Sequence, residues 1–354
     1  MSEGASEHAA FKINVKVGND MLSKRDNFLE TIHHGKPDRF VKQYEYMTML
    51  VGDQVNFYVR GNRYPGMDPL IDKFGTRILW PAGEQGAIPD PHVKVLQDIE
   101  EWKDVVKIPD LLGNCDQEEL WGPYLERAAQ VDRNETLLTM FAPTGIFERM
   151  HFLMGFEDTL MNVIMEPELL ADLAEALGEY RLNGYKLMIK YVHPDAILFH
   201  DDWGAKTQPF MKQEQFQEIL KKPFTEGYKY VHDQGIIVIH HSDSFNENIV
   251  PDMIDMYIDV WQGTLPTNDI AGLIEKYGDR ITFQGGLESS IFDGEESTEE
   301  QIRADVRRAC FEYGQHGSFI PCITYGGPGC FHPERDAIID DEIGKCSEEI
   351  FGLY

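Results

Sequence analysis

Short apolar runs alternate with longer helical patterns through most of the chain. The branched apolar residues at 236–239 are typical of a strand that is buried on both faces, as in a parallel sheet. Residues 166–190 instead repeat leucines at helical spacing, and Thr298 followed by Gln301 predicts a capped helix that runs to 313. The same criteria predict further strands at 40–47, 77–81, 137–143, 196–203, 256–263, 281–286 and 318–323.

About eight strands that alternate with helices predict an α/β fold, a (β/α)8 TIM barrel with an N-terminal extension and loop insertions. We expect one domain over residues 1–354, with an N-terminal arm and helix at 1–36. Pro223 lies inside the helical pattern of 213–232 and is expected to kink or break it. A doubly wound open sheet is the alternative, but no G-x-G-x-x-G or G-x-x-x-x-G-K-[ST] turn supports it.

Composition narrows the classes of partner. The chain has 61 acidic against 32 basic residues, a formal net charge of -29, which disfavours nucleic acid and anionic membrane surfaces. No apolar run approaches the roughly 20 residues that cross a bilayer. The first residues lack the apolar core of a secretory signal, so a cytoplasmic protein is expected. Five cysteines, an odd number, fit reduced thiols better than a disulfide framework.

Polar side chains collect where the predicted strands end. In a parallel barrel the carboxyl ends of the strands meet at one mouth, where enzymes of this architecture place their chemistry. We therefore expect the strand-end residues to face one another. They are Glu148, His200, Asp201, Asp202, Trp203, His240, His241, Asp243, Gln262, Gln284 and Cys322.

His241, Asp243 and Cys322 form a candidate set of ligands for a divalent metal ion. Zinc accepts an imidazole, a carboxylate and a thiolate, and a catalytic zinc site keeps a fourth position open for substrate. The alternative is that His241 is an ordinary hydrogen-bonded histidine and Cys322 a small buried apolar residue.

Asp202 and Glu148 are candidate catalytic carboxylates. Their alternatives are a solvated loop that caps the next helix for Asp202 and a structural ion pair for Glu148. Successive strand residues face opposite ways, so we expect only one of Asp201 and Asp202 to point into the mouth.

With these residues in view, the chain resembles the uroporphyrinogen decarboxylase superfamily, and in particular its cobalamin-dependent methyltransferase branch. The resemblance spans about residues 137–328 and implies the barrel fold with its site at the strand ends. It is carried by "HDDWGAKTQPFM" from His200, the "IHHSDS" turn, "YGDRITFQGGLESS" from Tyr277 and "GSFIPC" ending at Cys322.

Departures from the family pattern favour the methyltransferase branch over the decarboxylases, and methyl-ether cleavage over thiol methylation. The decarboxylases have an early arginine-rich segment, which "RFVKQYEYMTM" replaces here, and "PCITYGG" replaces their late histidine segment. The branch that methylates thiols holds zinc with H-x-C and a later Cys. His241 and Cys322 match that pattern, but Asp243 replaces the middle Cys. A carboxylate in place of a thiolate gives a harder, more Lewis-acidic ion, which suits cleavage of a methyl ether.

The resemblance therefore implies an O-demethylase methyltransferase. It would use Zn2+ to move a methyl group from a small methoxylated substrate, such as a phenyl methyl ether, to cob(I)alamin on a partner corrinoid protein. Glu148 or Asp202 would supply a proton, while Gln262 and the aromatic residues Tyr46, Trp203 and Tyr325 would contact the substrate. A homodimer is one option for assembly. The alternatives are a cofactor-free decarboxylase, a methylcobalamin:thiol methyltransferase and a barrel that only binds a ligand or partner.

Overall fold

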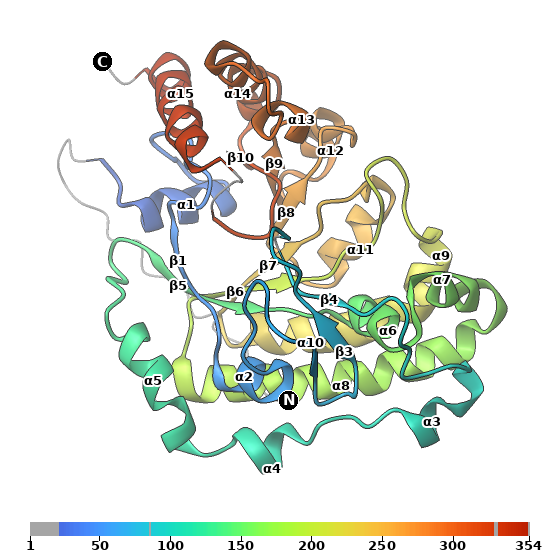
Figure 1. Cartoon of the computed structure of the whole chain (residues 1–354). Coiled ribbons are helices and arrows are strands. Elements are labelled where there is room, and N and C mark those ends of the chain that lie inside the picture. Colours follow the sequence, from blue (N-terminus) through green and yellow to red (C-terminus); the bar gives the residue numbers. More distant parts are fainter. Residues whose placement is uncertain (1–20, 85, 329–331, 353–354) are drawn as a thin grey trace, which may run out of the picture.

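The computed structural model describes residues 21–84, 86–328 and 332–352. Its main sheet contains parallel strands in the order β1-β5-β6-β7-β8-β9-β10, which curl together with helices on the outside (Figure 1). This is the predicted α/β architecture, a TIM-barrel-like fold. The strand bounds are β1 Met47–Leu50, β5 Leu137–Ala142, β6 Ala196–His200, β7 Ile237–His241, β8 Val260–Thr264, β9 Thr282–Gly286 and β10 Phe319–Cys322.

The N-terminal part of the strand prediction was wrong in two places. The first strand begins at Met47, where the predicted strand at 40–47 was to end. The segment at 77–81 is no barrel strand, because β3 (Arg77–Leu79) pairs antiparallel with β2 (Leu70–Ile71) and β4 (Ile88–Pro89) in a separate small sheet. The parallel sheet therefore has seven strands among the described residues instead of about eight.

Hydrogen bonds link residues 43–46, which precede β1, to Gln284 of β9 and to Ile323 after β10, and no pairing of β10 with β1 is present among the described residues. Tyr46 donates to Gln284 Oε1 at 2.9 Å, and Gln284 Nε2 donates to the Gln43 carbonyl at 3.1 Å. The Ile323 amide in turn donates to Gln43 Oε1 at 3.4 Å. Residues 43–46 thus complete the curled sheet with hydrogen bonds from side chains, and these bonds hold polar groups in its interior.

Helices cover the outside of the sheet (Figure 1). None of those within the described ranges is both long and apolar enough to cross a membrane. The α-helices are α1 Lys24–Ile32, α2 Gln54–Arg60, α3 Trp102–Val105, α4 Leu111–Cys115, α5 Glu118–Ala128, α6 Ile146–Met154, α7 Phe156–Met165, α8 Pro167–Val192, α9 Gln213–Phe216, α10 Lys222–Asp233, α11 Val250–Asp255, α12 Ile270–Tyr277, α13 Ser289–Phe292, α14 Glu299–Tyr313 and α15 Pro333–Phe351. The 3-10 helices are η1 Ile99–Glu101, η3 Glu247–Ile249 and η4 Gly314–His316.

Two of the predicted helix signals have clear structural counterparts. The capping box is present at the start of α14, where Gln301 N donates to Thr298 Oγ1 at 3.3 Å and Thr298 N donates to Gln301 Oε1 at 2.9 Å. Pro223 falls at the first turn of α10, preceded by the π-helical segment η2 (Gln217–Lys221). The predicted break is therefore a change of helix type, since proline has no amide hydrogen to continue the preceding pattern.

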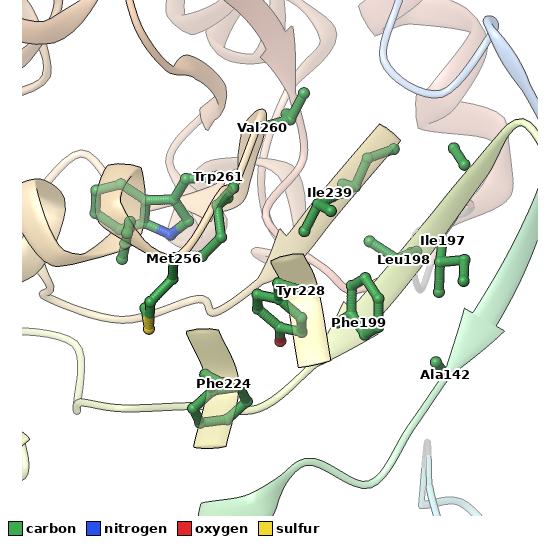
Figure 2. Packing of buried hydrophobic residues seen from close by; sticks show 14 of the residues in the cluster. Ala142, Ile197, Leu198, Phe199, Phe224, Tyr228, Ile239, Met256, Val260 and Trp261 are labelled. Carbon is green, nitrogen blue, oxygen red and sulfur yellow. The ribbon is translucent and has the colours of Figure 1, made fainter. Parts of the chain in front are cut away.

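The outer helices are attached to the strands by large apolar contacts. Figure 2 shows Phe199 of β6 close to Tyr228 of α10, with Phe224 one turn away on the same helix. The Phe199 and Tyr228 rings lie 4.4 Å apart between centroids, and Phe224 and Tyr228 lie 5.4 Å apart. All three are almost completely buried, and truncating one such ring typically costs about 3–5 kcal/mol. This packing fixes β6 and β7, the two strands that carry the candidate site.

Two sequence expectations, the N-terminal arm and the state of Cys330, concern residues that lie wholly or partly outside the described ranges. The N-terminal arm is described only from residue 21, where α1 soon follows, and the rest of it lies outside the described residues. Cys330 also lies outside them. The remaining cysteines, Cys115, Cys310, Cys322 and Cys346, are free thiols.

Candidate metal centre at the strand ends

Two imidazoles lie side by side at the carboxyl ends of neighbouring strands. His200 ends β6, His241 ends β7, and the two residues are partners in the parallel register. Their ring centroids are 4.6 Å apart. Because paired residues of neighbouring strands project to the same side of a sheet, both rings face the interior of the curled sheet. With Asp202 they form a group whose ligand atoms all lie within 4.8 Å of one another.

The hydrogen bonds of Gln262 decide which nitrogen of His241 carries the proton. Gln262 Nε2 donates to the Tyr325 carbonyl at 2.9 Å, so its Oε1 is the atom that faces His241. His241 Nδ1 lies 2.5 Å from that oxygen and must therefore be the protonated nitrogen. Burial, followed by the neighbouring His200 charge, holds the pKa of His241 well below its usual range. His241 is thus neutral, with the lone pair of Nε2 available to a cation.

The Nε2 lone pair of His241 faces a carboxylate. Asp202 Oδ1 lies 4.0 Å from it, and neither atom carries a proton to offer the other when both groups are in their ordinary forms. Ligands around a zinc ion at about 2.0–2.2 Å lie about 3.3–3.5 Å apart in tetrahedral geometry. The observed separation is slightly longer, so a small contraction would bring both atoms to one ion.

Glu148 lies next to Nδ1 of His200, the ring nitrogen that we expect not to face the ion. His200 Nδ1 lies 3.3 Å from Glu148 Oε2, an ion pair whose angle is outside hydrogen-bond geometry. Burial alone would lower the pKa of His200, but Glu148 outweighs it and raises the value to about 10. Burial alone would raise the pKa of Glu148, but His200 outweighs it and lowers the value to about 2. Glu148 is therefore ionised and His200 carries the proton.

The two histidines thus share one arrangement. Each has Nδ1 next to a side-chain oxygen, from Glu148 for His200 and from Gln262 for His241. This leaves Nε2 of each ring for a metal ion. Histidine ligands of metal ions almost always have such a partner, which sets the tautomer and the orientation of the ring. Binding of an ion would replace the proton that His200 otherwise keeps.

The acidic residues of the site outnumber its cations. Asp243 lies beside Asp202, with its amide donating to Asp202 Oδ1 at 3.2 Å. Burial raises the pKa of Asp202, and burial followed by the charge of Asp202 raises that of Asp243 to about 7. Glu148 adds a third carboxylate, next to the positive charge of His200. A divalent cation would neutralise this excess, and the donor set of two imidazoles and one carboxylate suits zinc.

Gly326 closes the other side of the two imidazoles. A Cβ at this position would lie 2.9 Å from Cδ2 of His200 and 3.0 Å from Cδ2 of His241. Any side chain here would push the rings apart, so the loop after β10 needs glycine to approach them this closely.

Asp201 and His240, the sequence neighbours of Asp202 and His241, point away from the candidate metal centre. Asp201 accepts the amides of Phe147 at 2.8 Å and Glu148 at 2.7 Å, which caps the start of α6. His240 is stacked on Trp203 with ring centroids 3.9 Å apart, and Tyr228 Oη lies 2.8 Å from its Nδ1. Burial lowers the pKa of His240 to about 3. Strand alternation therefore sends Asp201 and His240 into structural packing and Asp202 and His241 into the site.

Cys322 lies outside the donor group found among the described residues, and so does Asp243. The Cys322 thiol is fully buried, and Gln284 Nε2 donates to its sulfur at 3.5 Å. Burial raises the pKa of the thiol, an effect that contacts with Gln284 and Tyr44 only partly offset. The ligand set of His241, Asp243 and Cys322 implied by the sequence thus stays a prediction.

The expected aromatic substrate contacts differ in exposure. Trp203 is 1% exposed and Tyr46 is 0% exposed, and Tyr46 stacks on Phe28 with centroids 3.8 Å apart. Neither ring offers a free face in this structure. Tyr325 is partly exposed and bonds through its hydroxyl to Asp293. Of the three expected aromatic contacts, only Tyr325 has exposed surface for a ligand.

His200 is one of the predicted strand-end residues but is not in the predicted ligand set of His241, Asp243 and Cys322. Its signal in the sequence is its position: it lies in the predicted strand at 196–203, and the next predicted strand is followed by His240 and His241. Register then pairs His200 with His241, which the sequence does not specify.

Comparisons with known proteins support the fold. No protein-family model and no curated protein matches the chain. The chain is similar to a solved methyltransferase from Methanosarcina mazei, with a TM-score of 0.61, 13% identity, and coverage of 93% of this chain and 99% of that one. At this identity the likeness shows the fold: an α/β barrel, here with a candidate metal centre at its strand ends.

Two further solved structures are more distant. A B12-independent methionine synthase from Shewanella in complex with selenomethionine has a TM-score of 0.36 and 12% identity, and the match covers 64% of this chain and 66% of that one. A sugar phosphate isomerase/epimerase from Parabacteroides distasonis has a TM-score of 0.31 and 10% identity, with coverage of 64% and 76%. Neither likeness is strong enough to carry an argument.

Proposed function

We propose that this protein is a zinc-dependent methyltransferase that moves a methyl group from a small methoxylated, aromatic substrate to cob(I)alamin on a partner corrinoid protein. The observation that carries the proposal is the pair of imidazoles, each oriented through Nδ1, beside the Asp202 carboxylate at the strand ends. The similar fold of a solved methyltransferase over 99% of its length supports the same reaction class.

His200, His241 and Asp202 would hold the zinc ion. A zinc ion with nitrogen and oxygen ligands is a Lewis acid, and it would withdraw charge from the ether oxygen of a substrate at the open position. Glu148 and Gln262 act through the two histidines, because each fixes the ring that would reach the ion. They are therefore positioning residues in this proposal.

Asp243 is the proton donor that we propose for this reaction. In this reaction the methyl carbon–oxygen bond would break, cob(I)alamin on the partner would supply the methyl acceptor, and the bonding electron pair would stay on the leaving oxygen. That oxygen would need a proton, and burial followed by the charge of Asp202 raises the pKa of the Asp243 carboxyl to about 7, while the Asp243 backbone amide donates to Asp202. A general acid is most useful when its pKa is near the working pH. Glu148 is ionised and would not serve this role.

The test is methyl transfer measured with the purified, zinc-loaded protein. Reduced cob(I)alamin, free or on a corrinoid protein, is mixed with a panel of methoxylated aromatic compounds, and the methyl-cobalt absorption spectrum is followed. We expect transfer with at least one aromatic ether and a loss of at least a hundredfold in His241→Ala and Asp202→Asn. His92→Ala, at an exposed position, is the control. Full activity in both site variants, or in metal-free protein, would contradict the proposal.

A further inference from the structure

The helix α7 carries an apolar face that no described part of the chain covers. Met161 is 56% exposed, Ile164 75% and Met165 65%, and the last two are the most exposed large apolar side chains among the described residues. Positions three and four apart lie on one face of a helix, so these three side chains form one patch, the α7 face. The opposite face of the helix is buried through Thr159 and Val163. A contiguous exposed apolar patch often marks a site of interaction.

The α7 face lies at the end of the barrel that holds the candidate metal centre. In a parallel sheet the connection returns the chain from the carboxyl end of one strand to the start of the next. The long helix α8 makes that return to β6, and Figure 1 shows α7 at one end of α8 and α5 at the other. Gln215 Nε2 donates to the Val163 carbonyl at 3.2 Å, which attaches α7 to the segment after β6. Phe210 of the same segment lies 5.0 Å from Phe156, the first residue of α7, between ring centroids.

A second connection joins the α7 face to the site through α6. Glu148, which lies 3.3 Å from His200, is in the first turn of α6, and only Gly155 separates α6 from α7. A helix of nine residues is about 13 Å long, so α7 begins about that far from the imidazoles. A protein that covers the mouth of the barrel would therefore overlie α7 as well.

Negative charge flanks the α7 face and argues against a second copy of the chain as its occupant. Glu157 lies one turn before Met161 on the same side of the helix, and Glu168 follows in the first turn of α8; both are exposed. Asp158 is instead paired with Lys94 at 2.7 Å. Two copies would bring the same carboxylates together, in a chain whose formal net charge is -29. A partner with basic residues around an apolar patch would be attracted.

The size and composition of the α7 face suit a partner that binds and leaves. It is built by three side chains of a helix of ten residues, whereas interfaces of obligate dimers bury roughly 2,000 Å2 or more. Two of the three side chains are methionines, which adapt their shape to the surface that they contact. The proposed reaction needs a transient partner, because each methyl group would leave the enzyme on its carrier.

We propose that the α7 face is the docking surface for the protein that carries cob(I)alamin, and that this carrier meets it with an apolar patch flanked by basic residues. The inference rests on the proposed function, and it adds the place at which the partner binds. Docking there holds the carrier over the mouth of the barrel while leaving the candidate metal centre to the substrate.

The experiment compares two methyl acceptors with the full-length, zinc-loaded protein. One is free cob(I)alamin, and the other is cob(I)alamin on the corrinoid protein encoded nearest to the gene of this chain. We expect Ile164→Asp to raise the Kd and the KM for the corrinoid protein at least tenfold and to change the rate with free cob(I)alamin less than twofold. Glu157→Lys should raise the same Kd at low salt, with the difference disappearing at high salt, because exposed charges are screened there.

Leu112→Asp is the matched control. Leu112 is 49% exposed on α4, and its neighbour Leu111 lies next to Gly184, in the half of α8 that is remote from α7. This variant introduces the same charge at an exposed apolar position and should leave the Kd for the corrinoid protein unchanged. If Ile164→Asp does not fold, Met165→Ser removes apolar surface without adding charge, and at least a threefold rise in the Kd is expected.

The outcomes separate the inference from the proposed function. A corrinoid protein that binds Ile164→Asp as tightly as wild type, or an equal loss with both acceptors, would overturn the inference. Sedimentation that shows a wild-type dimer separated by Ile164→Asp would also overturn it and assign the α7 face to a second copy. Transfer to both acceptors that is insensitive to Ile164→Asp would leave the proposed function standing alone. Binding of the corrinoid protein that Ile164→Asp weakens, without methyl transfer to either acceptor, would support the docking surface and refute the reaction.

Discussion

Gln262→Met is expected to weaken zinc binding without removing any ligand. Gln262 is fully buried, and its Oε1 lies 2.5 Å from His241 Nδ1. Methionine has a similar length but no acceptor for this proton. The His241 ring is then free to move its proton to Nε2, the nitrogen that faces Asp202. Loss of such a partner typically costs tenfold to a hundredfold in metal affinity, about 1.4–2.8 kcal/mol.

Gln284→Met is the matched control for this variant. Gln284 pairs with Gln262 in the register of β8 and β9, is equally buried, and also makes hydrogen bonds through both ends of its amide. The two substitutions should therefore destabilise the fold to a similar extent. The two glutamines differ in their partners: Gln262 bonds to His241, whereas Gln284 bonds to Tyr46, Gln43 and the sulfur of Cys322.

The assay is competition for Zn2+ with a chromophoric chelator, alongside urea unfolding of each metal-free variant. We expect the zinc Kd to rise tenfold or more in Gln262→Met and to change less than threefold in Gln284→Met, at similar losses of unfolding free energy. The reasoning would be refuted if Gln284→Met weakened zinc binding as much as Gln262→Met did. That result would favour the ligand set with Cys322.

Three further results follow from the same geometry. Cys322→Ala should keep one zinc per chain by elemental analysis, and a protein that purifies without zinc would instead restore the thiolate as a ligand. Asp201→Ala removes both oxygen acceptors of the amides at the start of α6 and should lower the unfolding free energy by about 2 kcal/mol. Asp201→Asn should also be destabilised, because its Oδ1 accepts one amide while its Nδ2 faces the other. Equal stability of Asp201→Ala and wild type in urea would argue against the cap. Burial raises the pKa of Asp259 to about 7, so the folded state holds a proton that the unfolded state releases at lower pH, and stability should fall as pH rises from about 4 to 7. Asp259→Asn should therefore be more stable than wild type at pH 8, with the difference shrinking towards pH 4, and a difference independent of pH would exclude this cause.

The sequence predicted the barrel well where strands are buried on both faces. The run that ends at His241 is continuous and branched, which is typical of a parallel strand covered on both faces. The segment at 77–81 has similar residues, but β3 pairs antiparallel with two strands of its own region. Pairing depends on which segments meet in space, and a short apolar run does not contain that information.

The candidate site was predictable in location and less so in its ligands. The strand ends predicted which side chains would lie together, and Glu148, Asp202, His241, Asp243 and Gln262 do lie near one another there; their roles stay predictions. Which atoms approach each other depends on the register between strands. It also depends on residues such as Gln262, which bond to the histidines and set their orientation. Neither the pairing of His200 with His241 nor the tautomer of His241 can be derived from spacing along one strand.

The zinc-edge X-ray absorption fine structure of the zinc-loaded protein tests the central claim most directly. A centre built from His200, His241 and Asp202 has only nitrogen and oxygen neighbours, at about 2.0–2.2 Å, with the outer-shell scattering that two imidazoles produce. We expect that spectrum. A sulfur neighbour at about 2.3 Å would contradict the account and place Cys322 on the metal ion.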